Sequence, residues 1–190
     1  MSLKLFRSTG YSSILAAGES RVLTHPGWLV VTVSLWIGFG CNVALWRAVR
    51  ASGAGSSDLG RALLAGAFIA SGCLAVLSLF GWRRTVKHTA SVLLLLAAMA
   101  AASLWVQGRS LDSELLGQGL SNVLLPGWPG LLRWQFPVLL LGVGLAPMLW
   151  VWQLQLRRLP GPQQLACNVT GVLIGLACVA ATGWLLLGRY

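Results

Sequence analysis

The sequence predicts an all-α membrane protein, a polytopic helix bundle with about five transmembrane helices and a short outward-facing surface helix. Of its 190 residues, 56% are hydrophobic and only 9% are charged, whereas a soluble domain carries about 25% charged residues. The mean hydropathy is +0.76. Five charge-free intervals also have the length of about 20 residues that a helix needs to cross a bilayer.

The chain opens with a polar segment, residues 1–26, which we expect to be a cytoplasmic N-terminal tail. The rest, 27–190, is predicted to form one membrane domain. Basic residues bound the apolar intervals, as Arg61 and Arg83 do around the second. The predicted spans are 27–46, 62–82, 89–107, 134–156 and 165–187.

Tryptophan and small residues support these boundaries. Six tryptophans lie near span ends, where interfacial aromatic rings are enriched. Small residues recur four apart at Ser34 and Gly38 and at Gly171 and Gly175, which predicts close approach of helix backbones. The six tryptophans are Trp28, Trp46, Trp82, Trp105, Trp134 and Trp184.

The distribution of basic residues predicts the orientation. Eight Lys and Arg residues fall on the side of the N-terminus and six on the other side. Because cytoplasmic loops carry the excess of Lys and Arg, we expect the N-terminus in the cytoplasm and the C-terminus outside. The net charge of +10 reflects these span-end residues rather than a basic face, so we expect no nucleic acid partner.

The loop before the fourth span predicts the surface helix, over residues 110–125. Six apolar residues recur at helical spacing on one face, and Asp112 and Glu114 suit the positive end of the helix dipole. Gln118 and Asn122 are one turn apart, so their amides share a face and could bind a lipid head group. The alternative is that both simply face water. The apolar stripe is Leu111, Leu115, Leu116, Leu120, Val123 and Leu124.

We expect no catalytic centre and no metal site in this chain. The four cysteines lie in apolar stretches, where cysteine behaves as a small hydrophobic residue. The two histidines map to the cytoplasmic side and the acidic residues beyond the N-terminal tail to the opposite side, so they cannot combine as ligands or as a catalytic pair. These residues are Cys41, Cys73, Cys167 and Cys178, then His25 and His88, then Asp58, Asp112 and Glu114.

Several short motifs occur in an order that resembles one known family. Asn42 to Trp46 at the end of the first span resembles an Asn-x-x-aromatic-aromatic pattern. The segment Leu77–Phe80, a basic turn, Ser103 to Trp105 and then Gly-xxx-Asp-xx-Leu from Gly108 follow in sequence. Over about residues 28–190 the chain is similar to the N-terminal membrane domain of the lipid A phosphoethanolamine transferases, which include the mobile colistin resistance proteins.

The resemblance implies a function for this chain and also a catalytic domain that this sequence does not contain. In that family a zinc-dependent soluble domain with a threonine nucleophile transfers phosphoethanolamine from phosphatidylethanolamine to lipid A. This chain has no counterpart of that domain, so we expect it to be inactive alone, without cofactor, and to depend on a separately encoded or missing catalytic domain. The resemblance also implies the bacterial inner membrane.

The family's membrane domain recognises lipid through an Asp-x-x-Met-x-x-Asn segment followed by Thr and Glu. Here Leu115 stands at the Met position, Gln118 at the Asn position, Asn122 at the Thr position and Pro126 at the Glu position, so the polar set of the family is incomplete. A shift of four residues would place Asn122 at the Asn position, but Pro126 and Gly130 would then replace Thr and Glu. Gln118 and Asn122, together with Asn42 of the first-span motif, are the residues predicted to bind a phospholipid head group, with phosphatidylethanolamine as the expected lipid. The competing interpretation is a non-enzymatic membrane scaffold or a small transporter subunit.

Overall fold

The computed structural model describes residues 23–50, 56–82, 85–108, 128–156 and 160–188, which form the helix bundle that the sequence predicts. Within these residues, four helices are long and apolar enough to cross a membrane, and the first apolar helix, Pro26–Gly40, is shorter. The four long apolar spans start and end within four residues of the predicted intervals. They are Leu59–Leu79, Val86–Gln107, Gln135–Gln153 and Gly161–Leu187.

The first pass through the bundle is built from three pieces rather than from one helix over 27–46. Helix α3 (Pro26–Leu35) continues as the π-helix η1 (Trp36–Gly40), and α4 (Val43–Arg50) follows after a break. Proline at the first helical position and the His25 ring define the start of α3, because His25 Nδ1 accepts a hydrogen bond from the backbone N–H of Gly27 at 3.1 Å. Hydropathy predicts the apolar length of this pass but carries no information on the break.

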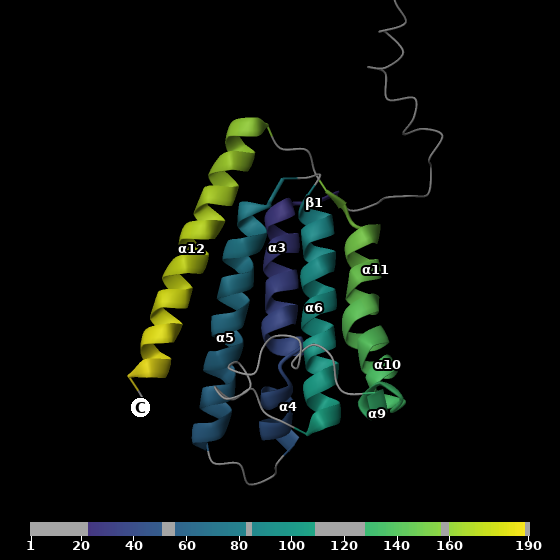
Figure 1. Ribbon diagram of the computed structural model, residues 1–190. Coiled ribbons are helices and arrows are strands. Elements are labelled where there is room, and N and C mark those ends of the chain that lie inside the picture. Colours follow the sequence, from purple (N-terminus) through teal and green to yellow (C-terminus); the bar gives the residue numbers. More distant parts are fainter. Residues whose placement is uncertain (1–22, 51–55, 83–84, 109–127, 157–159, 189–190) are drawn as a thin grey trace, which may run out of the picture.

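Successive passes through the bundle alternate in direction (Figure 1). A pair of two-residue strands, β1 (Leu23–Thr24) and β2 (Gln155–Leu156), joins the start of the first pass to the segment before the last helix in parallel register. The helical elements after α4 are α5 (Ser56–Leu79), α6 (Val86–Gln107), α9 (Trp128–Leu131), α10 (Gln135–Leu139), the π-helix η2 (Leu140–Leu145), α11 (Ala146–Gln153) and α12 (Gly161–Leu187).

The passes stand side by side in a row, in the order α12, α5, α3 with α4, α6, and α10 with α11 (Figure 1). Half of the apolar window of α6 is buried, against 6% for α12. The core therefore lies around α3 and α6, where Leu29, Leu77, Leu94 and Val151 are fully enclosed. The outer face of α12 is apolar, as a surface solvated by lipid tails should be.

Glycine and small side chains let neighbouring helices approach closely, as the sequence predicts. A Cβ built on Gly175 would lie 2.8 Å from the backbone nitrogen of Ala75, so α12 packs directly on the α5 backbone. A Cβ on Gly38 would lie 2.6 Å from Ala70 Cβ on α5. Both contacts require the absence of a side chain.

Basic residues at the helix ends satisfy backbone carbonyls of neighbouring helices. Arg47 Nη2 donates to the carbonyl oxygen of Leu104 at 2.8 Å, near the C-terminus of α6. Lys87 Nζ donates to the carbonyl oxygen of Leu154 at 2.6 Å, directly after α11. The last carbonyls of a helix lack intrahelical partners and carry negative partial charge, so a cation there stabilises the helix end.

Candidate functional site

Asn42, a predicted head-group residue, is buried at the break between η1 and α4. Its side-chain Oδ1 accepts a hydrogen bond from the backbone N–H of Leu45 at 3.1 Å, and its Nδ2 donates to the carbonyl oxygen of Ala62 at 3.1 Å. Asn42 therefore caps α4 and ties it to α5. Head-group binding by Asn42 stays a prediction.

The surface helix predicted over 110–125 lies outside the described residues. Gln118 and Asn122, the other two predicted head-group residues, lie there too. Their role stays a prediction, as does the exposure of Asp112 and Glu114.

Beside Asn42, the structure contains a lateral cavity of about 620 Å³, which we term the arginine pocket. Small-molecule sites in proteins commonly enclose about 300–1,000 Å³. The cavity lies between the first pass, α6 and the junction of α10 with η2. Its walls include Trp36, Cys41, Trp46, Arg50, Trp105 and Val143.

Two cations lie over the Trp105 ring, and one of them, Arg50, lines the arginine pocket. The guanidinium carbon of Arg50 lies 5.3 Å from the centre of the Trp105 ring, and that of Arg47 lies 5.9 Å from it. Cations within about 6 Å of a tryptophan ring are attracted by its quadrupole. The ring therefore holds positive charge at the edge of an apolar cavity.

The two arginines differ in their remaining contacts. Arg47 donates to the C-terminal carbonyls of α6, and Arg133 Nη1 reaches the carbonyl oxygen of Val106 at the same end, at 3.3 Å. Arg50 is exposed and makes no hydrogen bond to another described residue. Its guanidinium, with five N–H donors, is the group of this pocket best able to bind an anion.

The cavity lies where two π-helices meet. Trp36 Nε1 in η1 donates to the carbonyl oxygen of Val143 in η2 at 3.0 Å. A π-helix shifts the backbone hydrogen bonds by one residue, and such segments are frequent at functional sites because they reshape a helix surface locally. The indole bond keeps the two segments in register across the cavity.

Histidine, cysteine and acidic side chains are the residues that can bind metal ions. The part of the chain that the structure describes contains no group of three or more His, Cys, Asp and Glu residues placed to hold a metal ion. The His88 ring makes an edge contact with Trp152, at 5.3 Å between ring centres, and the His25 ring caps α3.

The sequence does not reveal the pairing of Arg50 with Trp105 or of Trp36 with Val143. Each pair joins distant segments, and sequence alone predicts a membrane anchor for any interfacial arginine or tryptophan.

Comparison with family models, with curated proteins and with solved structures finds no match to this chain. The fold defines a class, the polytopic α-helical membrane proteins.

Proposed function

We propose that this chain is a membrane domain that binds a phospholipid and presents its head group at the membrane surface. The observation that carries the proposal is the Arg50 guanidinium held on Trp105 at the mouth of an apolar lateral cavity. A phospholipid needs these two environments next to each other, because its phosphate is an anion and its acyl chains are apolar.

The arginine pocket offers a partner to each chemical group of phosphatidylethanolamine: the phosphate, the ammonium group and the acyl chains. Arg50 binds the phosphate through charge-assisted hydrogen bonds, while the exposed indole rings of Trp36 and Trp46 attract the ammonium group. Trp36 also borders a second cavity of about 400 Å³ beside Leu94 and Val151, which offers apolar walls to an acyl chain.

The proposed activity agrees with the resemblance to phosphoethanolamine transferases. With the N-terminus in the cytoplasm, the arginine pocket opens at the outer surface of the bacterial inner membrane, where the family's zinc-dependent domain acts. The chain would anchor that half and present phosphatidylethanolamine to it for transfer to lipid A. The transfer chemistry belongs to a catalytic partner, and this chain contributes lipid binding alone.

Binding to nanodiscs tests the proposal. The purified chain, titrated with fluorescent phosphatidylethanolamine and phosphatidylglycerol, should prefer phosphatidylethanolamine. Arg50→Gln should weaken that binding about tenfold, because a hydrogen bond to a charged group contributes roughly 1.5–3 kcal/mol.

Arg61→Gln is the matched control, because it removes the same charge from an exposed position on α5 outside the pocket. It should leave the affinity unchanged. Equal affinity for the two phospholipids, or equal effects of the two variants, would contradict the proposal and favour a membrane scaffold.

A further inference from the structure

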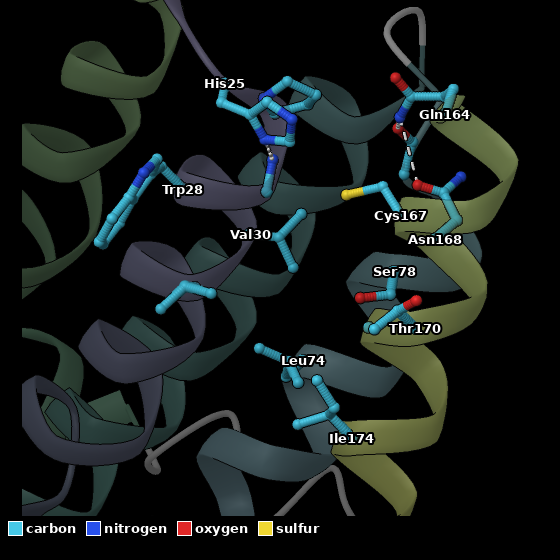
Figure 2. A pocket seen from close by; sticks show the side chains of 15 residues that line it. His25, Trp28, Val30, Leu74, Ser78, Gln164, Cys167, Asn168, Thr170 and Ile174 are labelled. Carbon is cyan, nitrogen blue, oxygen red and sulfur yellow. Dashed lines mark hydrogen bonds between the residues drawn. The ribbon is translucent and has the colours of Figure 1, made fainter. Parts of the chain in front are cut away.

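Another lateral cavity lies at the opposite end of the bundle from the arginine pocket, between α3, α5 and α12 (Figure 2). It encloses about 500 Å³, and we term it the histidine pocket. Its polar end is formed where α3 begins, α5 ends and α12 begins. His25, Gly81 and Gln164 mark these three helix ends.

The Gln164 side chain orients the polar end. It is 7% exposed, and its Nε2 donates to the carbonyl oxygen of Gly81 at 2.7 Å and to Asn168 Oδ1 at 3.2 Å. The Gln164 oxygen is then left as an acceptor without a partner among the described residues. His25 Nδ1 accepts from Gly27, so the neutral His25 ring keeps its Nε2–H as a donor.

Ser78 supplies an unpartnered hydroxyl at the wall of the cavity. The residue is 4% exposed, yet its hydroxyl makes no hydrogen bond to any described residue. Ser34 Oγ, on α3, is also without a hydrogen-bond partner among the described residues, whereas Ser71 Oγ donates to the carbonyl oxygen of Phe68 at 2.9 Å and Ser91 Oγ to that of Lys87 at 2.8 Å. In Figure 2 Ser78 lies beside the cavity, below Cys167. Because Ser78 lines the cavity, an acceptor group of a ligand bound there would give its hydroxyl a hydrogen-bond partner.

The depth of the cavity matches one leaflet. Below the polar end its walls become apolar, with Val30, Leu74 and Ile174 (Figure 2). Gln164 and Ile174 are ten residues apart on α12, or about 15 Å along the axis at about 1.5 Å per residue. This is about half of the hydrocarbon thickness of roughly 30 Å.

None of the described residues that line this cavity carries a formal charge when His25 is neutral. An anionic or zwitterionic head group would lose hydration there without gaining a counter-charge. Hydroxyl and ester groups, in contrast, need the single donors and acceptors that Ser78, Gln164 and His25 provide.

We propose that the histidine pocket binds an uncharged glycerolipid, a diacylglycerol or monoacylglycerol. Its acyl chain lies along Val30 and Ile174, and its hydroxyl and ester groups meet Ser78 and Gln164. The site is separate from the arginine pocket and does not depend on phospholipid binding there.

Photolabelling with a diacylglycerol that carries a diazirine on one acyl chain tests this site in the full chain. Label should map by mass spectrometry to the peptides of α3 and α12 around the cavity. Unlabelled diacylglycerol should compete at least tenfold better than phosphatidic acid with the same chains. Label spread over all lipid-facing helices, or equal competition by phosphatidic acid, would overturn the proposal.

Two matched pairs of variants sharpen the test. Ser78→Ala should reduce labelling about fivefold, the effect of one lost hydrogen bond, whereas Ser71→Ala on the same helix should not. Ile174→Trp should block the cavity, whereas Leu173→Trp, on the exposed face beside it, should not. Arg50→Gln should leave the labelling unchanged, which separates this site from the arginine pocket. Equal labelling within either matched pair would contradict the assignment.

Discussion

The Trp36 indole and the Val143 carbonyl oxygen are joined by a hydrogen bond of 3.0 Å across 107 residues of sequence. The bond connects η1 to η2 at the wall of the arginine pocket. A polar contact within an apolar surrounding holds these two helix segments at a defined distance.

Trp36→Phe should separate the two segments while retaining an aromatic ring. We expect a loss of roughly 0.5–1.5 kcal/mol in unfolding free energy, the range of one intramolecular hydrogen bond, measured by denaturant unfolding in detergent micelles. Trp28→Phe is the control, because Trp28 is 66% exposed and its ring nitrogen makes no hydrogen bond to a described residue. A loss of the same size in both variants would show that the indole bond contributes nothing specific.

Asn42→Ala should destabilise the protein by about 2 kcal/mol, because it removes the cap of α4 and the link to Ala62 together. Asn42→Asp should retain the cap but place an anion near the Ala62 carbonyl oxygen, so it should also destabilise. Thermal unfolding measures both effects. If Asn42→Ala instead reduces phospholipid affinity at unchanged stability, the residue acts on the head group rather than on the fold.

Gly175→Ala should cost roughly 1–3 kcal/mol, because the added methyl group overlaps the Ala75 backbone. Gly72→Ala makes the same change on α5, where nothing lies within 4 Å of the new Cβ. It should be neutral or stabilising, since alanine favours the helix. Cross-linking between cysteines introduced on α5 and α12 measures the separation of the two helices, and unaltered cross-linking in Gly175→Ala would refute the predicted overlap.

Replacing Gln118 and Asn122 together by alanine should weaken phosphatidylethanolamine binding by roughly 1–3 kcal/mol if the amides contact the head group. Titration in nanodiscs measures the affinity, and circular dichroism checks that the variant is folded. Unchanged affinity in a folded variant would remove these two residues from the site and leave the arginine pocket unaffected.

A reporter fused after Tyr190 tests the orientation. The excess of Lys and Arg on the N-terminal side favours an outward C-terminus, so an alkaline phosphatase fusion, active only in the periplasm, should be active. A cytoplasmic fluorescent reporter at the same position is the complement. Activity of that reporter with an inactive phosphatase would reverse the assignment and place the arginine pocket on the cytoplasmic side.

The sequence was sufficient for the positions of the four long apolar helices, because each follows an apolar interval bounded by basic residues. It also indicated the close helix contacts at Gly38 and Gly175. The break at Asn42 could not be predicted, since hydropathy averages over a window and contains no information on which carbonyl an amide will meet.

The candidate site was harder to predict for the same reason. Arg50, Trp105 and Trp36 each match the composition of a membrane interface, so their individual positions suggest anchoring. Only the fold brings them around one cavity. The position of α6 between the first pass and α10 creates that proximity, and no local pattern encodes it.

The glycine contact between α12 and α5 also bears on how the bundle assembles during synthesis. The ribosome makes α12 after the other described helices, and α12 packs mainly on α5, at the end of the row (Figure 1). Helices that insert independently associate afterwards within the bilayer. The four earlier passes can therefore reach their native arrangement while α12 is still leaving the insertion machinery, and the histidine pocket is complete only once α12 has docked along Gly175.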